Sequence, residues 1–168
     1  MPLPSCQWKS FFITDIFPSK IQRGKRLIHE NQIPGLIPYV SSTALNNGVD
    51  CFIGNDVKIR FFSDCISLAN SGSVGSCFYE PFTFIASDHV THLKREGLSS
   101  WSYLFITTML RRLSEKYNFN REISDYRIAR EKVLLPVNVN GEPDFEYMEQ
   151  YMKNIMIEKY STYINYVS

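Results

Sequence analysis

The sequence predicts a protein of the α/β (α+β) class, in which a curved, partly barrel-like β-sheet with flanking helices precedes one long C-terminal helix. Short strand-like runs, divided by Gly, Ser, Asn, Asp and Pro, extend to about residue 93, and helical spacing of apolar residues begins near residue 100. With 168 residues, 44% of them hydrophobic, the chain can bury a core without a disulfide or a metal. We expect a body over residues 1–141 and a helical appendage over 142–168.

The first part of the chain predicts strands and turns. Residues 8–13 are aromatic and β-branched enough for a strand that runs into a short helical turn, and residues 18–26 form a basic loop. A strand over 36–41 is expected at a sheet edge or with a bend, because Pro38 has no amide hydrogen. The Asn-Asn-Gly run at 46–48 predicts a tight turn, since these residues tolerate positive φ. Further short strands are expected at 51–53, 57–62, 65–69, 77–79, 82–86 and 88–93.

The pattern then changes from strands to helices. Residues 101–116 predict a helix capped by Ser99 or Ser100, with basic side chains gathered near its C-terminal end. A short helix is expected over 123–129 and a last strand over 132–137.

The final helix, predicted over 144–165, is the longest, at about 30 Å. Its apolar residues fall on one face, and most of its charged residues fall elsewhere. This stripe lies against the chain's own sheet or pairs with another helix, and the residues leave both alternatives open. Its members are Phe145, Met148, Met152, Ile155, Met156, Tyr160, Tyr163 and Ile164.

Several functional classes find no support in the sequence. No apolar stretch approaches the roughly 20 residues of a membrane helix, and the N-terminus lacks the apolar segment of a secretory signal. The four cysteines form no CxxC pair, so we expect free thiols in a reducing, cytoplasmic setting. There is no GxGxxG, Walker A or GxSxG motif, and His89 and His92 alternate faces of a strand-like run. We expect no catalytic residue, metal or cofactor in this chain.

A net charge of +1 argues at first against DNA binding, because most simple DNA-binding domains are strongly basic. The total averages +4 over residues 1–132 and −3 over 133–168. Four loops carry the Lys, Arg, Asn, Ser and Thr side chains that neutralise phosphates and read base edges. These loops lie at 20–26, 41–47, 70–73 and 116–121.

Three segments resemble the target-recognition domain of the specificity (S) subunits of bacterial restriction–modification systems, of the type I-like and type IIB-like kinds. They are IPYVSSTALNNGVDCFI at 37–53, LANSGSVGSCFYEPFTFIASDHVTHL at 68–93 and YNFNREISDYRIAREKVLLPVNVNGEPDFEYMEQYMK at 117–153. The resemblance covers nearly the whole chain. The GKR loop at 24–26 and the LLPV…GEPDFEYMEQYMK end are its most specific parts.

The resemblance implies a non-catalytic subunit that recognises double-stranded DNA and directs a partner adenine methyltransferase or endonuclease. S-adenosylmethionine and Mg²⁺ are then expected in the partner. A full S subunit has two recognition domains, and this chain shows one. The resemblance therefore implies that the C-terminal helix forms a homodimer or pairs with a second recognition domain. The alternative is a protein-interaction module that masks or regulates another effector through this helix.

The resemblance also places regions of this chain near the DNA groove. The residues expected to contact phosphates are Lys20, Arg23, Lys25 and Arg26. The residues expected to contact base edges are Ser42, Thr43, Asn46, Ser73, His89 and Arg121.

Overall fold

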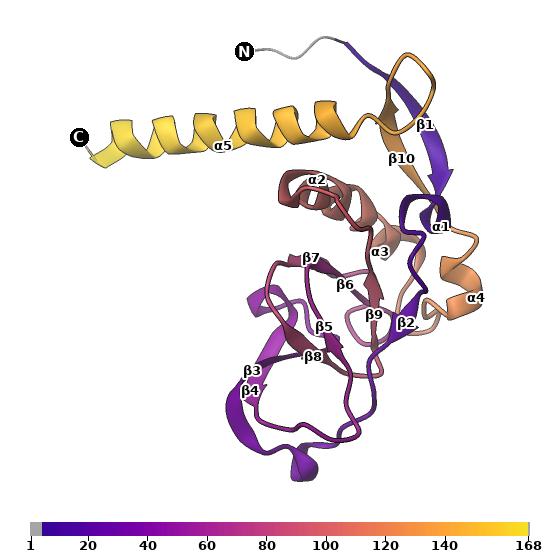
Figure 1. The fold of residues 1–168 in the computed structure, drawn as a ribbon, viewed down its shortest axis with the longest axis vertical. Coiled ribbons are helices and arrows are strands. Elements are labelled where there is room, and N and C mark those ends of the chain that lie inside the picture. The colour runs from indigo at the N-terminus through magenta and orange to yellow at the C-terminus, as the bar shows by residue number, and fades with distance from the viewer. Residues whose placement is uncertain (1–4, 168) are drawn as a thin grey trace.

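The computed structural model describes residues 5–167 and arranges them in layers (Figure 1). The strands are β1 (Gln7–Phe12), β2 (Gln22–Arg23), β3 (Pro34–Val40), β4 (Val49–Ile53), β5 (Phe61–Phe62), β6 (Cys65–Ala69), β7 (Cys77–Glu80), β8 (Phe84–Ala86), β9 (Val90–Leu93) and β10 (Lys132–Val137). The helices are α1 (Ile13–Ile16), α2 (Ser100–Leu110), α3 (Leu113–Lys116), α4 (Asp125–Ile128) and α5 (Phe145–Val167), with short 3-10 turns η1 (His29–Asn31) and η2 (Asn46–Gly48).

The strands form two four-stranded sheets and one two-stranded ribbon. One sheet has the order β2-β9-β6-β7, the other has the order β4-β3-β8-β5, and β1 pairs antiparallel with β10. A cluster that includes Val40, Cys65 and Phe84 packs between the two sheets. Neither sheet closes on itself, so the α/β prediction is confirmed and the barrel-like character is only partial.

Helix α2 lies between the β6–β7 face and α5, and it supplies the centre of the larger core (Figure 1). Tyr103 and Ile106 are completely buried there against Ile66 and Leu68. Such burial removes large apolar side chains from water and stabilises the fold by about 2 kcal/mol for each. Ser99 caps this helix by accepting a hydrogen bond from the amide of Ser102 at 3.2 Å. Of the two predicted caps, Ser99 and Ser100, the structure therefore has Ser99.

Most predicted elements are present, and two of them differ from the prediction. Strand β3 lies inside its sheet, so the first of its two predicted alternatives, an edge position, is wrong, while register shifts interrupt its pairing with β4 on both sides of Pro38. Pro38 is tolerated because the parallel pairing of β3 with β8 begins only at Tyr39, one residue later. The strand predicted over 57–62 shrinks to β5 because Lys58 adopts a positive φ of 57°.

Glu80, at the end of β7, is a buried carboxyl group in this core. It is 1% exposed and accepts a hydrogen bond from the Ser67 hydroxyl at 2.9 Å. Burial raises the pKa of Glu80 to about 7 from an ordinary 4.5, and the Ser67 hydrogen bond opposes this only in part.

Replacing Glu80 with Gln is expected to make folding less sensitive to pH. The unfolded chain releases this proton from about pH 4.5, but the folded chain keeps it until about pH 7, so stability falls across that window. Glu80→Gln keeps the polar contact to Ser67, so at pH 8 it should be more stable than the unchanged chain by about 2–3 kcal/mol. Urea unfolding at pH 4.5 and pH 8 checks this, with exposed Glu96→Gln as the control. Parallel pH profiles for the unchanged chain and Glu80→Gln would contradict the prediction.

Helix α5 packs on the body only through its first turns. Met148 is fully buried, and Phe145 and Met152 are partly buried against the same core. The predicted stripe therefore begins against α2 and not against a sheet. Figure 1 shows the rest of α5 projecting away from the body, and its last three turns are exposed, including Tyr160 and Tyr163 at 61% and 62%.

Candidate nucleic-acid interface

The polar loops, far apart in the sequence, meet through backbone hydrogen bonds. The amide of Ser73 donates to the carbonyl of Ser42 at 3.0 Å, which joins the second loop to the third. The amide of Ile123 donates to the carbonyl of Asn70 at 3.0 Å, which brings the fourth loop against the third. We call this assembly the loop cluster. It consists of residues 24–26, 41–46, 70–75, 86–91 and 118–125.

Asn70 lies at the centre of the loop cluster and is 1% exposed. Its backbone amide donates to the carbonyl of His89 at 3.0 Å, and its Nδ2 atom donates to Thr91 Oγ1 at 3.0 Å. Together with the bond from Ile123, these contacts join the loop of Asn70 to two others, 86–91 and 118–125. The sequence marks Asn70 only as one polar residue in a turn, because each of its partners is distant along the chain.

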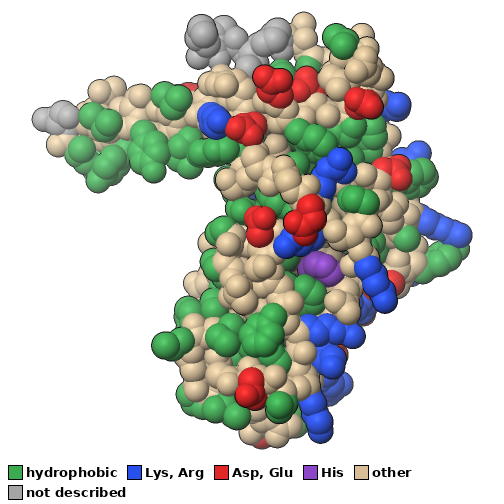
Figure 2. Space-filling model, in the orientation of Figure 1, with side chains coloured by type: hydrophobic (Ala, Val, Ile, Leu, Met, Phe, Trp, Pro, Cys, Tyr) green, Lys and Arg blue, Asp and Glu red, His purple; other side chains and the backbone are tan. Residues whose placement is uncertain are grey.

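The basic loop is attached to the turn between β8 and β9. The amides of Gly24 and Lys25 each donate at 3.1 Å, to the carbonyls of Val90 and Ala86. The side chains of Lys25 and Arg26 remain exposed, as does that of Lys20. Figure 2 shows Lys and Arg side chains along the right-hand edge of the body, on the side of β2 and α4. This edge can attract phosphates.

Arg23 differs from the other predicted phosphate contacts because its guanidinium already has partners. Its Nε atom lies 2.7 Å from a carboxylate oxygen of Asp125, and another of its nitrogens donates to the carbonyl of Ile123 at 3.2 Å. Arg23 therefore ties the basic loop to the fourth loop, whatever it contributes to DNA. Its contact with a phosphate stays a prediction.

The predicted base-contacting residues lie at different depths in the loop cluster. Asn46, His89 and Arg121 are exposed, while the other three are partly buried. The hydroxyl of Thr43 accepts the amide of Leu45 at 3.1 Å, so it shapes its own turn. These loops bring the six residues into one region; which of them reads a base stays a prediction.

Sequence reasoning missed the residues that bind the loops to one another. Arg60 donates to the carbonyl of Arg23 at 2.6 Å, and the hydroxyl of Ser71 donates to Glu122 at 2.5 Å. No local pattern marks these pairs, which are 37 and 51 residues apart. One local signal exists in this region: Ser124 is a typical helix N-cap, and it places Asp125 in the first turn of α4.

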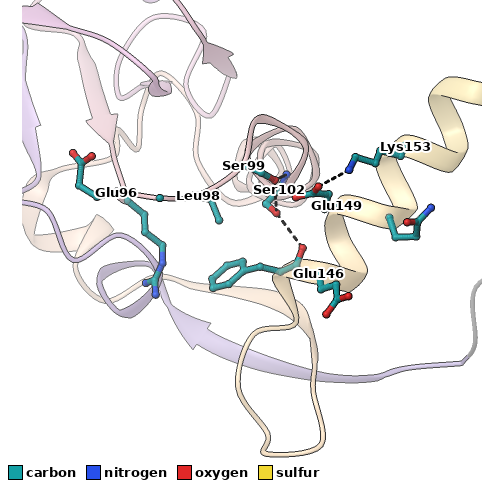
Figure 3. A pocket seen from close by; sticks show the side chains of 11 residues that line it. Glu96, Leu98, Ser99, Ser102, Glu146, Glu149 and Lys153 are labelled. Atoms are coloured by element: carbon teal, nitrogen blue, oxygen red, sulfur yellow. Dashed lines mark hydrogen bonds and ion pairs between the residues drawn. The ribbon is translucent and has the colours of Figure 1, made fainter.

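A cavity of about 600 Å³ lies at the junction between the body and α5 (Figure 3). Ser102 donates to the carbonyl of Phe145 at 3.1 Å, and the Lys153 amine lies 2.5 Å from a carboxylate oxygen of Glu149. The Lys153 hydrogen bond lowers the pKa of Glu149. With Glu96 and Glu146 also in its lining, this cavity is unsuited to phosphates. Its contacts instead set the direction in which α5 leaves the body.

The cysteines in the core are poor nucleophiles. Burial raises the pKa of both Cys65 and Cys77 to about 12, so both thiols stay protonated near neutral pH. Among residues 5–167, no three His, Cys, Asp or Glu side chains are grouped so as to hold a metal ion. Within the same described range, no helix is long and apolar enough to span a membrane.

Comparison with known proteins places these features in context. Residues 6–164 match the family described as the type I restriction modification DNA specificity domain. Over 152 residues the chain is 31% identical to the specificity subunit S.BcgI of the type II restriction enzyme BgcI from Heyndrickxia coagulans, covering 89% of this chain and 44% of that protein.

Two solved structures share the fold at lower identity. The S subunit of a type I restriction-modification system from M. genitalium superposes with a TM-score of 0.68 at 14% identity, over 94% of this chain and 40% of that one. The HsdS subunit from Thermoanaerobacter tengcongensis gives 0.63 at 12% identity, over 94% and 39%. The chain thus spans about two fifths of the length of these relatives.

Proposed function

This chain belongs to the family of type I restriction modification DNA specificity domains, and from that premise we propose that it reads double-stranded DNA for a restriction–modification enzyme. The observation that carries the proposal is the loop cluster, in which five separate segments are joined by backbone hydrogen bonds and buried Asn70 connects three of them. The cluster includes the exposed cations Lys25 and Arg26. Polar side chains beside cations on a rigid frame suit recognition of a charged duplex.

The proposed mechanism is recognition without chemistry in this chain. Lys20, Lys25 and Arg26 neutralise phosphates and set the register, while the base-contacting residues of the loop cluster discriminate between base edges. The bound domain then presents an adenine to a partner methyltransferase, which takes the base out of the stack. S-adenosylmethionine and Mg²⁺ would belong to that partner. We propose that the complex acts in the cytoplasm.

We propose that helix α5 brings in the second recognition domain by pairing with another copy of this chain. Its last three turns expose the apolar stripe, and Figure 2 shows hydrophobic side chains along the underside of the projecting helix. A second copy of this chain, packed through the same stripe, would bury it in a two-fold arrangement. Identical domains related by such an axis read the two halves of a split palindromic target.

Selection from a randomised duplex library tests the DNA-reading proposal. We expect the full chain to enrich one motif, with binding that weakens steeply as salt rises. Changing both Lys25 and Arg26 to Ala should weaken binding to all duplexes alike and lower the slope of log K against log salt by about 2. Lys159→Ala, on the exposed part of α5, is the matched control and should leave the slope unchanged.

The outcome that sinks this proposal is a library that yields no enriched motif. The exposed stripe on α5 then favours the second candidate, a module that regulates another effector through this helix. In that case removing the charges of Lys25 and Arg26 would leave its function intact, while changes to the stripe would abolish it.

A further inference from the structure

Two large aromatic rings lie exposed in the segment between α3 and β10. Phe119 is 75% exposed and Tyr126 is 64% exposed. Single exposed rings are common on protein surfaces, so exposure alone indicates nothing. Here both rings occur within one stretch, residues 117–130, which also carries Arg121, Arg127 and Arg130. We call this stretch the aromatic arm.

Phe119 stands in a turn that hydrogen bonds hold in shape. Asn118 and Arg121 form an isolated β-bridge, with backbone bonds of 3.2 and 2.8 Å in the two directions. The Asn118 side chain accepts the amide of Asn120 at 3.0 Å inside the same turn. The backbone that carries the exposed Phe119 ring is therefore preorganised, and binding through this ring would lose little conformational entropy.

Two arginines of the aromatic arm rest on tyrosine rings. The Arg130 guanidinium lies 3.8 Å from the centroid of Tyr126, and that of Arg121 lies 5.3 Å from the centroid of Tyr117. A guanidinium that lies over a ring uses its face and keeps its in-plane N–H donors for other partners. Both arginines are exposed, and neither forms an ion pair within residues 5–167.

The carboxylates of the aromatic arm are already engaged. Glu122 accepts the Ser71 hydroxyl, and Asp125 pairs with Arg23. A hydroxyl does not neutralise a carboxylate, so Glu122 keeps its negative charge, but Arg121, Arg127 and Arg130 outnumber it and the net charge of the arm is positive. Residues 118–125 of the arm already belong to the loop cluster, and the same contacts fasten them to its other loops, because Ser71 lies in the third loop and Arg23 precedes the GKR loop. A duplex on the loop cluster would have its next phosphates near the arm.

We propose that the aromatic arm extends the DNA-contacting surface of the loop cluster, in which Arg130 binds a phosphate and Phe119 packs against bases in the groove beside the predicted base contact Arg121. Tyr126 acts through Arg130 as a positioning residue. This inference rests on the proposed DNA-reading function and adds to it the contacts of Phe119 and Arg130 with the duplex. An apolar ring in a groove contacts a thymine methyl group or wedges into a base step.

Fluorescence anisotropy with the selected duplex tests the arm in the full-length chain. Phe119→Ala should weaken binding on the order of tenfold without changing the salt slope, and Phe119→Leu should retain part of the affinity. Phe52→Ala, which removes a ring 57% exposed on β4, is the matched control and should leave affinity unchanged. Arg130→Ala should lower the salt slope by about 1. Circular dichroism of each variant checks that the fold is retained.

A double-mutant cycle tests the positioning role of Tyr126. Tyr126→Ala should weaken binding, Tyr126→Phe should not, and Tyr126→Ala combined with Arg130→Ala should be no worse than Arg130→Ala alone. A duplex that contains 2-aminopurine distinguishes two kinds of groove contact. Its fluorescence should rise if Phe119 wedges into a base step and should stay quenched if Phe119 contacts a thymine methyl group. Either result supports a groove contact, provided that Phe119→Ala loses affinity.

The possible failures are separable. A full-length chain that binds its selected duplex, with Phe119→Ala and Arg130→Ala equal to it in affinity and salt slope, overturns this inference alone. A loss of copurifying methyltransferase in Phe119→Ala, with DNA binding unchanged, overturns it in favour of a protein contact. A chain that enriches no motif overturns the proposed function, and this inference with it.

Discussion

Replacing Gly24 with alanine is expected to dislodge the basic loop and destabilise the chain by about 2–4 kcal/mol. A Cβ atom at Gly24 would lie 1.9 Å from the carbonyl oxygen of Ala86 and 2.3 Å from that of Ser87. These are backbone atoms of the turn between β8 and β9, so no flexible side chain can yield. The loop must move, which breaks the bonds from the Gly24 and Lys25 amides to this turn.

The loss of both anchors should also impair DNA binding, because Lys25 and Arg26 would no longer be held against the other loops of the cluster. Thermal unfolding should show a fall in Tm of about 5–15 °C, and anisotropy should show a weakened duplex complex at temperatures where the variant is folded. Gly97→Ala is the control: nothing lies within 4 Å of its added Cβ, and its φ of +74° costs only about 1 kcal/mol. Equal melting of the Gly24 and Gly97 variants would refute the close-approach argument.

Introducing charge into the exposed stripe of α5 is expected to separate the proposed dimer. Tyr160 and Ile164 are four residues apart on one face, 61% and 57% exposed, in the part of the helix that leaves the body. If two copies bury this stripe against each other, Tyr160→Glu with Ile164→Glu places four carboxylates in one interface. The dissociation constant should rise on the order of 100-fold, because each buried charge loses its hydration without a partner.

Light scattering coupled to size exclusion measures this directly. The unchanged chain should elute as a dimer and the double variant as a monomer with the same melting temperature, since these residues do not touch the core. Ser161→Glu with Asn165→Glu adds the same charge to the other face of the exposed helix and should remain dimeric. A double variant that still dimerises would remove α5 from the interface.

The elements could be predicted closely because their signals are local. The apolar spacing of α2 and α5, the serine cap at Ser99 and the Gly and Asn turns depend on residues a few positions apart. The interior position of β3 could not be predicted, because its parallel pairing with β8 joins Tyr39 to Ile85 across distant sequence. Periodicity also left open what the α5 stripe packs on; the structure places its first turns on α2.

The residues of the candidate site were also predictable only where their signal is local. Residue types alone selected the basic loop and three polar loops, because charge and hydrogen-bonding groups are properties of each side chain. They did not distinguish Lys25, which is exposed, from Arg23, which is committed to Asp125. Nor did they single out Asn70, Arg60 or Glu122, whose partners are 21, 37 and 51 residues away.

The sequence by itself determined the α/β class, the order of the elements, the amphipathic terminal helix and the chemical character of the loops. Each of these follows from the side chains present within one or two turns of chain. Tertiary structure alone decided that the segments of the loop cluster meet, that Arg23 pairs with Asp125 and that α5 is covered in its first turns and exposed in its last ones. These depend on contacts between residues remote in sequence, which form only when burial of the core brings their strands together.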